Sequence, residues 1–262
     1  MLLAPAPKPL LLLQCEVLAD SLPEMCAVSG ETDVQFLHAL EQGPALRDRP
    51  DALPLTVCRV CTGETPPPLD TVAGVIISGS SAMAGDPVPW IAQTRAWLSQ
   101  ALDAGLPVLG VCFGHQLLAH LLGGRVDYMA QGPEYASVEV RLTHEAAGDR
   151  LFGQLPECFK AQAAHYQAVL TPPPGAVVLA EGDSGIHALR FAPNAWGVQF
   201  HPEFGADDQR LLLEALGAKL SAAGCDVASD LRRVAATPEA RSVLPRFRQL
   251  VSDSPEPRAR LD

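Results

Sequence analysis

The stretch Val108-Leu109-Gly110-Val111-Cys112-Phe113-Gly114-His115-Gln116 decides the fold class of this chain. Apolar residues over 107–111 predict a buried strand, and residues 114–122 predict a helix that begins almost without a linker. The Gly-x-Cys-x-Gly pattern between them is typical of a nucleophile elbow, a tight turn that raises one side chain above the edge of a sheet. Glycine is required on both sides because the strand and the helix leave no room there for a Cβ atom.

The cysteine in this turn has a chemical and a structural interpretation. A thiol is a good nucleophile, and a helix N-terminus together with a nearby imidazolium stabilises its thiolate. The amide N–H of Phe113 would then point at a developing oxyanion. In the structural interpretation, Cys112 is an inert buried residue of a glycine-rich turn. The turn alone does not decide between the two.

A second stretch, Gly197-Val198-Gln199-Phe200-His201-Pro202-Glu203, supplies the partners that the chemical interpretation needs. Residues 195–200 predict a strand that presents His201, and Glu203 follows across a proline that restricts the backbone. A cysteine hydrolase needs a base beside its thiol and a carboxylate that orients the base. Because open α/β sheets place their sites at strand ends, we expect Cys112, His201 and Glu203 to meet at one edge.

The rest of the chain predicts an α/β fold with an open, mostly parallel twisted sheet flanked by helices, because strands and helices alternate. The expected strands cover 10–15, 55–60, 74–78, 107–111 and 195–200, and the expected helices cover 33–42, 90–104, 114–122 and 208–222. Alternating patterns over 138–142 and 176–181 predict a few antiparallel edge strands.

The composition after residue 222 predicts a change of organisation. We expect one domain over residues 1–222 and a C-terminal helical extension with a flexible tail over 223–262. The extension is expected to form helices over 226–236 and 239–251 and to lie beyond the core. A chain cut after Ala222 would then remain folded.

The charge of the chain excludes several classes of function. The formal net charge is -11 and the sequence pI is about 5.0, so the surface repels phosphate backbones and anionic lipids. We therefore expect neither a nucleic acid nor a membrane as partner. No apolar run is long enough to span a bilayer, and the proline-broken N-terminus is unlike a secretory leader, so we expect a cytoplasmic protein.

The seven cysteines, an odd number, predict reduced thiols instead of a disulfide framework. Cys58 and Cys61 form a C-x-x-C pair, but no second pair of ligands completes a zinc site. Two half-buried residues near a strand end are therefore favoured over a metal or redox role. We expect no metal and no cofactor.

Together these motifs resemble the class I glutamine amidotransferases, whose signature is G-x-C-x-G-x-Q followed far downstream by H-P-E. Ile77-Ser78-Gly79-Ser80-Ser81 is similar to the oxyanion strand and loop of that family. Asp86-Pro87-Val88-Pro89-Trp90-Ile91 is similar to a segment of its stand-alone, GMP-synthase-like subgroup. The resemblance covers about residues 10–220 and implies a flavodoxin-like fold.

The resemblance also implies roles for the three residues of the triad. Cys112 would attack the side-chain carbonyl of glutamine, form a γ-glutamyl thioester and release ammonia. His201 would move the protons, and Glu203 would orient His201.

Further roles carry over from the family to matching positions. Gly79 and Phe113 would donate main-chain N–H groups to the oxyanion, and Gln116 would contact the substrate. Tyr135 would line the pocket for the amino and carboxylate ends of glutamine. The sequence departs from the subgroup at His165-Tyr166-Gln167, where relatives often carry His-x-Asp.

Three functions stay open at this point. The first is a glutaminase that passes ammonia to a separate synthetase, because the chain has no Gly-x4-Gly-Lys-Ser/Thr loop to activate an acceptor. The second is a γ-glutamyl peptidase or hydrolase with the same triad, which a wide pocket mouth would favour. The third is an inactive binding or regulatory module, which a failure to form the thioester would favour.

Overall fold

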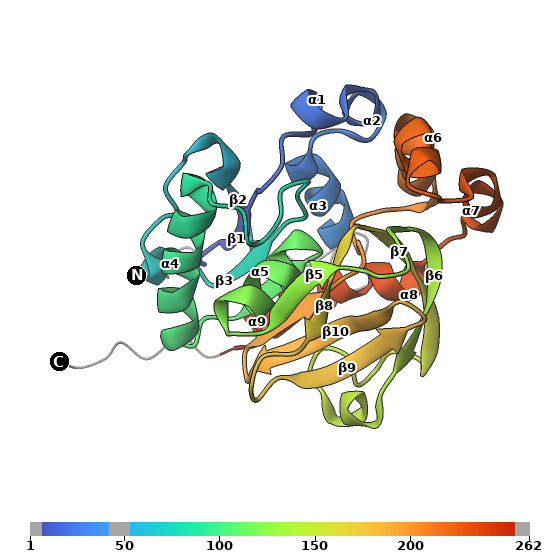
Figure 1. Cartoon of the computed structure of the whole chain (residues 1–262). Helices are drawn as coiled ribbons and strands as arrows, with labels where there is room; N and C mark the ends of the chain where they lie inside the picture. The colour runs from blue at the N-terminus through green and yellow to red at the C-terminus, as the bar shows by residue number, and fades with distance from the viewer. Residues whose placement is uncertain (1–6, 42–52, 255–262) are drawn as a thin grey trace.

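The computed structural model of the protein describes residues 7–41 and 53–254 (Figure 1). Its strands are β1 (Leu10–Leu13), β2 (Leu55–Cys58), β3 (Gly74–Ile77), β4 (Val108–Val111), β5 (Arg125–Tyr128), β6 (Glu134–Leu142), β7 (Cys158–His165), β8 (Gln167–Thr171), β9 (Val177–Gly182), β10 (Gly185–Ala192) and β11 (Ala195–Val198). Its α-helices are α1 (Leu18–Ser21), α2 (Pro23–Ser29), α3 (Thr32–Glu41), α4 (Pro89–Asp103), α5 (Phe113–Leu121), α6 (Ala206–Ala222), α7 (Val227–Arg233), α8 (Pro238–Arg241) and α9 (Val243–Ser252). Short 3₁₀ helices cover Val60–Thr62, Leu69–Thr71 and His144–Gly148.

The central sheet has a parallel half and an antiparallel half. In the described part of the chain it contains nine strands in the order β2-β1-β3-β4-β11-β10-β9-β6-β7. The first five are parallel to one another, and β10, β9, β6 and β7 continue the sheet with antiparallel pairings. The predicted open α/β sheet is confirmed, and its antiparallel part is larger than the few edge strands expected. Strand β10 was missed because its apolar and polar residues do not alternate regularly. Strand β7 was missed although its apolar residues alternate with Lys160 and Gln162.

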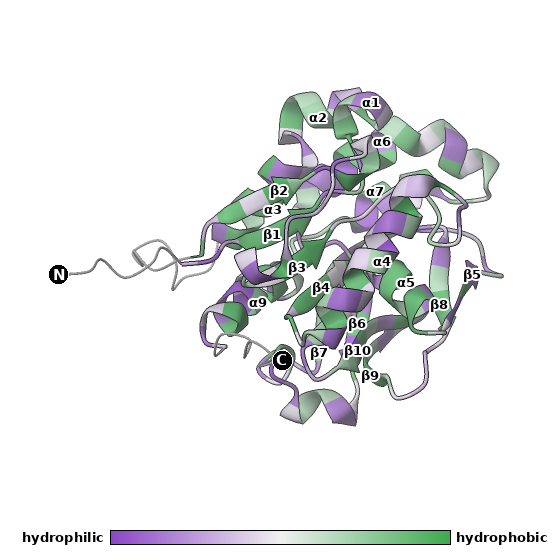
Figure 2. Ribbon diagram, turned by 90° about the vertical axis from the view of Figure 1, so that its left-hand side faces the viewer, coloured by the Kyte–Doolittle hydropathy of each residue, from purple (hydrophilic) through white to green (hydrophobic). Residues whose placement is uncertain are grey.

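Helices cover both faces of the parallel half. Leu11 and Leu13 pack into the cluster under α4 and α5, whereas Leu10 and Leu12 pack into the cluster under α3 and α9. This division follows from the two-residue period of a strand. Both faces are therefore apolar, and β1, β3 and β4 are hydrophobic along their length (Figure 2). Such strands suit a parallel sheet that is buried on both sides.

The C-terminal helix α9 belongs to the main core. The Phe247 ring lies edge-on to Trp196 of β11 at 6.4 Å, and a Cβ atom added to Gly74 would lie 2.8 Å from Val251. We therefore propose that the folded unit extends through α9 and does not end at residue 222. The helices expected over 226–236 and 239–251 correspond to α7 and to α8 with α9. The expected tail lies mostly outside the described residues, as does residue 42, the predicted end of the first helix.

Four helices gather at the end of the sheet where the parallel strands finish. Helices α1 and α2 follow β1, and α6 and α7 follow β11 (top of Figure 1). Helix α2 packs beside α6 through a separate apolar cluster that includes Met25, Phe204 and Leu213. Residues of α1 and α6 line a cavity at the carboxyl ends of β3, β4 and β11. Within the described ranges, no helix combines the length and the apolar character needed to cross a membrane.

Candidate active site

Cys112 sits at a sharp turn between β4 and α5. Its φ of 49° and ψ of -101° make it the one non-glycine residue with positive φ in the described part of the chain. L-residues rarely adopt this conformation, which is common at functional sites. A Cβ atom on Gly114 would lie 2.5 Å from the Ile77 carbonyl oxygen, and one on Gly110 would overlap the main chain of Gly114. The geometry is the elbow that the Gly-x-Cys-x-Gly pattern predicts.

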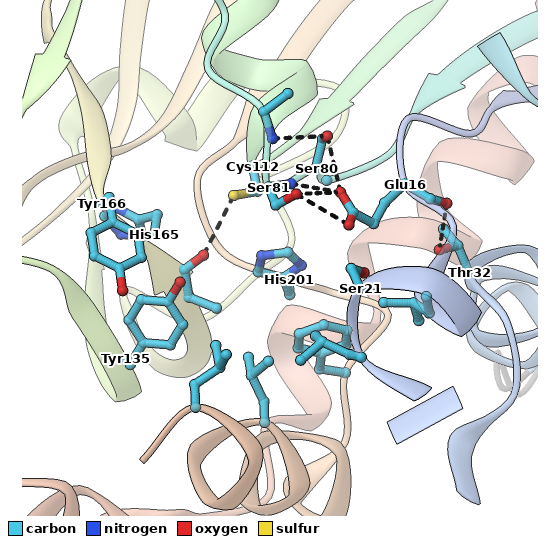
Figure 3. Close-up of a pocket in the computed structure, with 18 of the residues that line it drawn as sticks. Glu16, Ser21, Thr32, Ser80, Ser81, Cys112, Tyr135, His165, Tyr166 and His201 are labelled. Carbon is cyan, nitrogen blue, oxygen red and sulfur yellow. Dashed lines mark hydrogen bonds between the residues drawn. The ribbon is translucent and has the colours of Figure 1, made fainter. Parts of the chain in front are cut away.

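The structure brings His201 and Glu203 to the same place. Nδ1 of His201 lies 2.7 Å from Oε1 of Glu203, and both side chains are buried. The His201 main-chain N–H donates to the Gln162 carbonyl at 2.8 Å, and its ring stacks on Phe204 with centroids 4.4 Å apart. Cys112 and His201 face the same cavity (Figure 3). The three predicted triad residues are thus neighbours, although they come from two distant stretches of sequence.

The surroundings of His201 favour its charged form. Burial by itself lowers the pKa of His201, but Glu203 and then Cys112 raise it, and the net pKa lies well above the ordinary value. The surroundings therefore favour an imidazolium, which would stabilise a thiolate beside it.

We expect Glu203→Gln to lower the pKa of His201, because the neutral amide no longer stabilises the imidazolium. The raised pKa of His201 keeps the ring charged up to a higher pH. When the variant loses this raised pKa, activity should decline at a lower pH than in the wild-type protein. Turnover should fall on the order of 10²- to 10⁴-fold, as when a triad loses its orienting carboxylate. The pH profile of kcat/KM measures this, with the exposed Glu214→Gln as control. A variant with an unchanged profile and rate would show that Glu203 does not orient His201.

Gly79 lies beside both the thiol and the imidazole. A Cβ atom at Gly79 would come 2.9 Å from Cε1 of His201 and 3.8 Å from Cβ of Cys112. Phe113 begins α5 directly after the nucleophile. These are the two positions from which the sequence predicts oxyanion donors, and their donor role stays a prediction.

Gly79→Ala is expected to inactivate the site without unfolding the chain. The new methyl group must displace the His201 ring, and small displacements of catalytic groups cost on the order of 10²-fold in rate. Turnover and thermal unfolding should be compared with Gly148→Ala, because a Cβ atom at Gly148 has no neighbour within 4 Å. Equal turnover in the two variants would mean that the His201 position is not critical.

Gln199 is a site residue that sequence reasoning missed. Its buried Nε2 donates to Sγ of Cys112 at 3.6 Å, and its Oε1 accepts from Nε2 of Gln116 at 3.2 Å. Cys112 Sγ also lies 3.7 Å from the Ala164 carbonyl oxygen. The signal was present, because the two-residue period of an extended chain places Gln199 on the same side as His201.

Glu16 is the second missed residue, and it fastens the loop that carries Gly79. The Ser81 main-chain N–H donates to Oε2 of Glu16 at 2.7 Å, and the Ser80 hydroxyl donates to the same oxygen at 3.1 Å (Figure 3). Glu16 follows β1, whose carboxyl end joins the edge where open α/β sheets bind ligands. The position of Glu16 just after a predicted strand could therefore have identified it as a site residue from the sequence.

The cavity around Cys112 has a volume of about 380 Å³. Gln116 and Tyr135 line it, as predicted, and their contact with substrate stays a prediction. The Gln116 amide donates to the Gln167 carbonyl at 2.7 Å, which fixes its orientation. Burial raises the pKa of Tyr135, so its phenol remains neutral, and its ring meets Tyr166 edge-on at 5.5 Å.

His165 serves to hold the cavity wall together. Its Nε2 lies 3.0 Å from Oε2 of Glu134, and its Nδ1 lies 3.0 Å from the Gln167 carbonyl oxygen. Gln167 lines the cavity where the subgroup often has an aspartate. This wall therefore offers an uncharged amide in place of a carboxylate.

Cys58 and Cys61 lie near the end of a strand, as expected for the C-x-x-C pair. Cys58 is buried at the end of β2, and Cys61 is half-buried in the 3₁₀ helix that follows. Both are free thiols, and burial raises the pKa of Cys58 to about 11. Across residues 7–41 and 53–254, no three His, Cys, Asp or Glu side chains form a group that could hold a metal ion.

Comparisons of the sequence place these features in a family. The family model described as glutamine amidotransferase class-I matches residues 53–216. One subunit of the glutamine-hydrolyzing GMP synthase of Halobacterium salinarum is 39% identical over 145 residues, which cover 54% of this chain and 73% of that protein. The corresponding subunit of Methanocaldococcus jannaschii is 37% identical over 134 residues, or 50% and 65% of the two chains. GMP synthase of Aeropyrum pernix is 39% identical over 136 residues, but the match spans 52% of this chain and a quarter (25%) of that protein.

Solved structures agree in fold. A glutamine amidotransferase from Thermotoga maritima superposes with a TM-score of 0.69 at 18% identity, covering 95% of this chain and 99% of that chain. One from Methylobacillus flagellatus superposes with a TM-score of 0.62 at 21% identity, covering 94% and 92%. The family model covers well over half of the chain, so this protein belongs to the class I glutamine amidotransferases.

Proposed function

We propose that the protein hydrolyses the side-chain amide of L-glutamine to glutamate and ammonia through a γ-glutamyl thioester on Cys112. The observation that carries this proposal is the common cavity of the elbow thiol and the His201–Glu203 pair, whose Nδ1 and Oε1 lie 2.7 Å apart. A nucleophile, a base and an orienting carboxylate in this arrangement support acyl transfer.

In the first half of the reaction, His201 holds the thiol proton and the Cys112 thiolate adds to the amide carbon. The main-chain N–H groups of Gly79 and Phe113 stabilise the oxyanion of the tetrahedral intermediate. His201 then gives its proton to the leaving nitrogen, the C–N bond breaks, and ammonia departs. The γ-glutamyl group remains as a thioester on Cys112.

In the second half, His201 takes a proton from water, and the resulting hydroxide adds to the thioester carbon. The C–S bond breaks, the thiolate regains its ion pair with the imidazolium, and glutamate leaves. Glu203 keeps Nδ1 of His201 protonated in both halves, so that Nε2 faces the reacting atoms.

A separate synthetase is the proposed receiver of the ammonia. Two of the relatives above are each named as one subunit of a glutamine-hydrolyzing GMP synthase, a name that implies a further subunit. This chain contains no Gly-x4-Gly-Lys-Ser/Thr loop that would bind a nucleotide to activate an acceptor.

The proposal is tested by incubating the purified protein with L-glutamine and measuring ammonia, with mass spectrometry of the intact protein in parallel. We expect ammonia and a γ-glutamyl adduct on the Cys112 peptide. Absence of both, also with γ-glutamyl dipeptides, would reject the enzyme and favour a binding or regulatory module.

One observation favours γ-glutamyl amides or peptides as a second candidate substrate class. Tyr135 and Tyr166 lie on one side of His201, and Ser21 lies on the other (Figure 3). Leu18 and Leu22 line the cavity together with Ser21. Because His201 would protonate the leaving nitrogen, we propose that a substituent on that nitrogen extends toward these two leucine side chains. Free glutamine has no such substituent, and a cavity of about 380 Å³ is within the range that holds larger ligands.

The two substrate classes are separated by comparing kcat/KM for glutamine with kcat/KM for γ-glutamyl-leucine and γ-glutamyl-aspartate. Because Leu18 and Leu22 line the cavity, we expect the leucine dipeptide to be cleaved faster than the aspartate dipeptide and Leu22→Asn to remove this preference. Leu37→Asn on the outer face of α3 is the control. Cleavage of glutamine alone would exclude γ-glutamyl peptides as substrates.

A further inference from the structure

Arg241 reaches the predicted triad from a part of the chain that the family match, residues 53–216, does not include. It ends the short helix α8, and its Nη1 donates to the main-chain carbonyl of Glu203 at 2.9 Å. A Cβ atom at Gly205 would lie 3.6 Å from the same Nη1. The guanidinium therefore lies against the backbone of the segment that carries His201 and Glu203.

A hydrogen-bond network fixes the segment that leads to Arg241. The Ala235 main-chain N–H donates to the Ser137 hydroxyl at 3.0 Å, and the Ala235 carbonyl accepts from Nε2 of Gln162 at 2.8 Å. The Ser137 hydroxyl donates in turn to Oε1 of Gln162 at 2.7 Å. Gln162 also accepts the His201 main-chain N–H. One residue of β7 thus anchors both the base and the segment that delivers Arg241.

Arg241 also has an electrostatic effect on the imidazole of His201. Burial lowers the pKa of Arg241, while the carboxylates of Asp208 and Glu203 oppose that change. A guanidinium stays charged at neutral pH even so. Its positive charge offsets part of the negative potential that Glu203 exerts on His201 and, through it, on Cys112.

We propose that Arg241 is a positioning residue for the His201–Glu203 pair. It holds the Glu203 main chain by a hydrogen bond, and its positive charge offsets part of the negative potential of the Glu203 carboxylate. This inference rests on the proposed roles of Cys112, His201 and Glu203. It assigns to the C-terminal segment a part in the chemistry as well as in the fold.

The test measures the rate at which iodoacetamide alkylates Cys112 as a function of pH, by mass spectrometry of the Cys112 peptide. Removing a nearby cation raises the pKa of every acid around it, so Arg241→Met should move the alkylation midpoint up by about half a unit to one unit. Turnover should fall on the order of tenfold with little change in KM. Arg241→Lys keeps the charge and should keep the midpoint. Arg246→Met, on α9 beside Gln154, is the control.

Thermal unfolding establishes that each variant is folded. A folded Arg241→Met with the wild-type midpoint, or an Arg241→Lys that shifts as far as Arg241→Met, would overturn the proposal. If Arg241→Met does not fold, Arg241→Gln decides, because it keeps a donor for the Glu203 carbonyl without the charge and must show the same upward shift. Alkylation needs no substrate, so this result stands apart from whether glutamine is hydrolysed.

Discussion

Cys112→Ser is expected to lower turnover on the order of 10⁴-fold or more while the protein stays folded. Serine is close in size to cysteine and keeps the elbow, whose flanking Gly110 and Gly114 are unchanged. A hydroxyl is a far weaker acid and a far weaker nucleophile than a thiol. Loss of a nucleophile alone removes most of the catalysis of a triad.

Ammonia release and thermal unfolding should both be measured for this variant. The matched control is Cys158→Ser, because Cys158 is exposed at the start of β7 and does not line the cavity. Cys112→Ser with near-normal turnover would require another nucleophile. An unfolded Cys112→Ser would mean that the thiol is needed for packing, and alkylation of the wild-type protein would then identify the nucleophile.

A chain cut after Ala222 is expected to give no folded protein. Helix α9 places five side chains in the main core, and removing a large buried side chain costs about 2–5 kcal/mol. The combined loss of about 10–25 kcal/mol matches or exceeds the total stability of about 5–15 kcal/mol that is usual for a domain. These five side chains are Val243, Leu244, Phe247, Leu250 and Val251. This expectation replaces the one drawn from sequence, in which the core stands without the extension.

Soluble yield and circular dichroism measure the result. The control is a chain that ends at Ser254, which keeps every residue that the structure describes. Phe247→Ala removes only one of these core side chains and is the milder test. It should lower the free energy of unfolding by about 3–5 kcal/mol. A folded and active 1–222 fragment would show that α9 only covers a core that is stable by itself.

The sequence predicted those parts of the fold and site that depend on local patterns. The elbow needs two glycines and a cysteine within five positions, and His201 and Glu203 are two residues apart, so each half of the site is visible in a short window. Their meeting followed from the general rule on strand ends. The apolar runs of β1, β3 and β4 likewise identified the parallel half of the sheet.

The rest could not be predicted because it depends on contacts between distant segments. Nothing near Glu16 in the sequence indicates that its carboxylate binds the Ser81 main chain, 65 positions away. The amphipathic pattern of α9 indicates a helix but does not say which apolar surface it covers. Arg241 donates to the Glu203 carbonyl across 38 positions, through a contact that no spacing rule specifies.

The backbone at Cys112 also bears on how this position can evolve. Glycine has no Cβ atom and adopts a φ of 49° freely, whereas other residues there give up about 1–3 kcal/mol. The backbone contribution alone therefore favours drift toward glycine at the one position where a thiol is proposed to act. β-branched residues are the least tolerated at positive φ, so threonine, despite its hydroxyl, is a poor replacement. A lineage that no longer needed the reaction would be expected to lose Cys112 early.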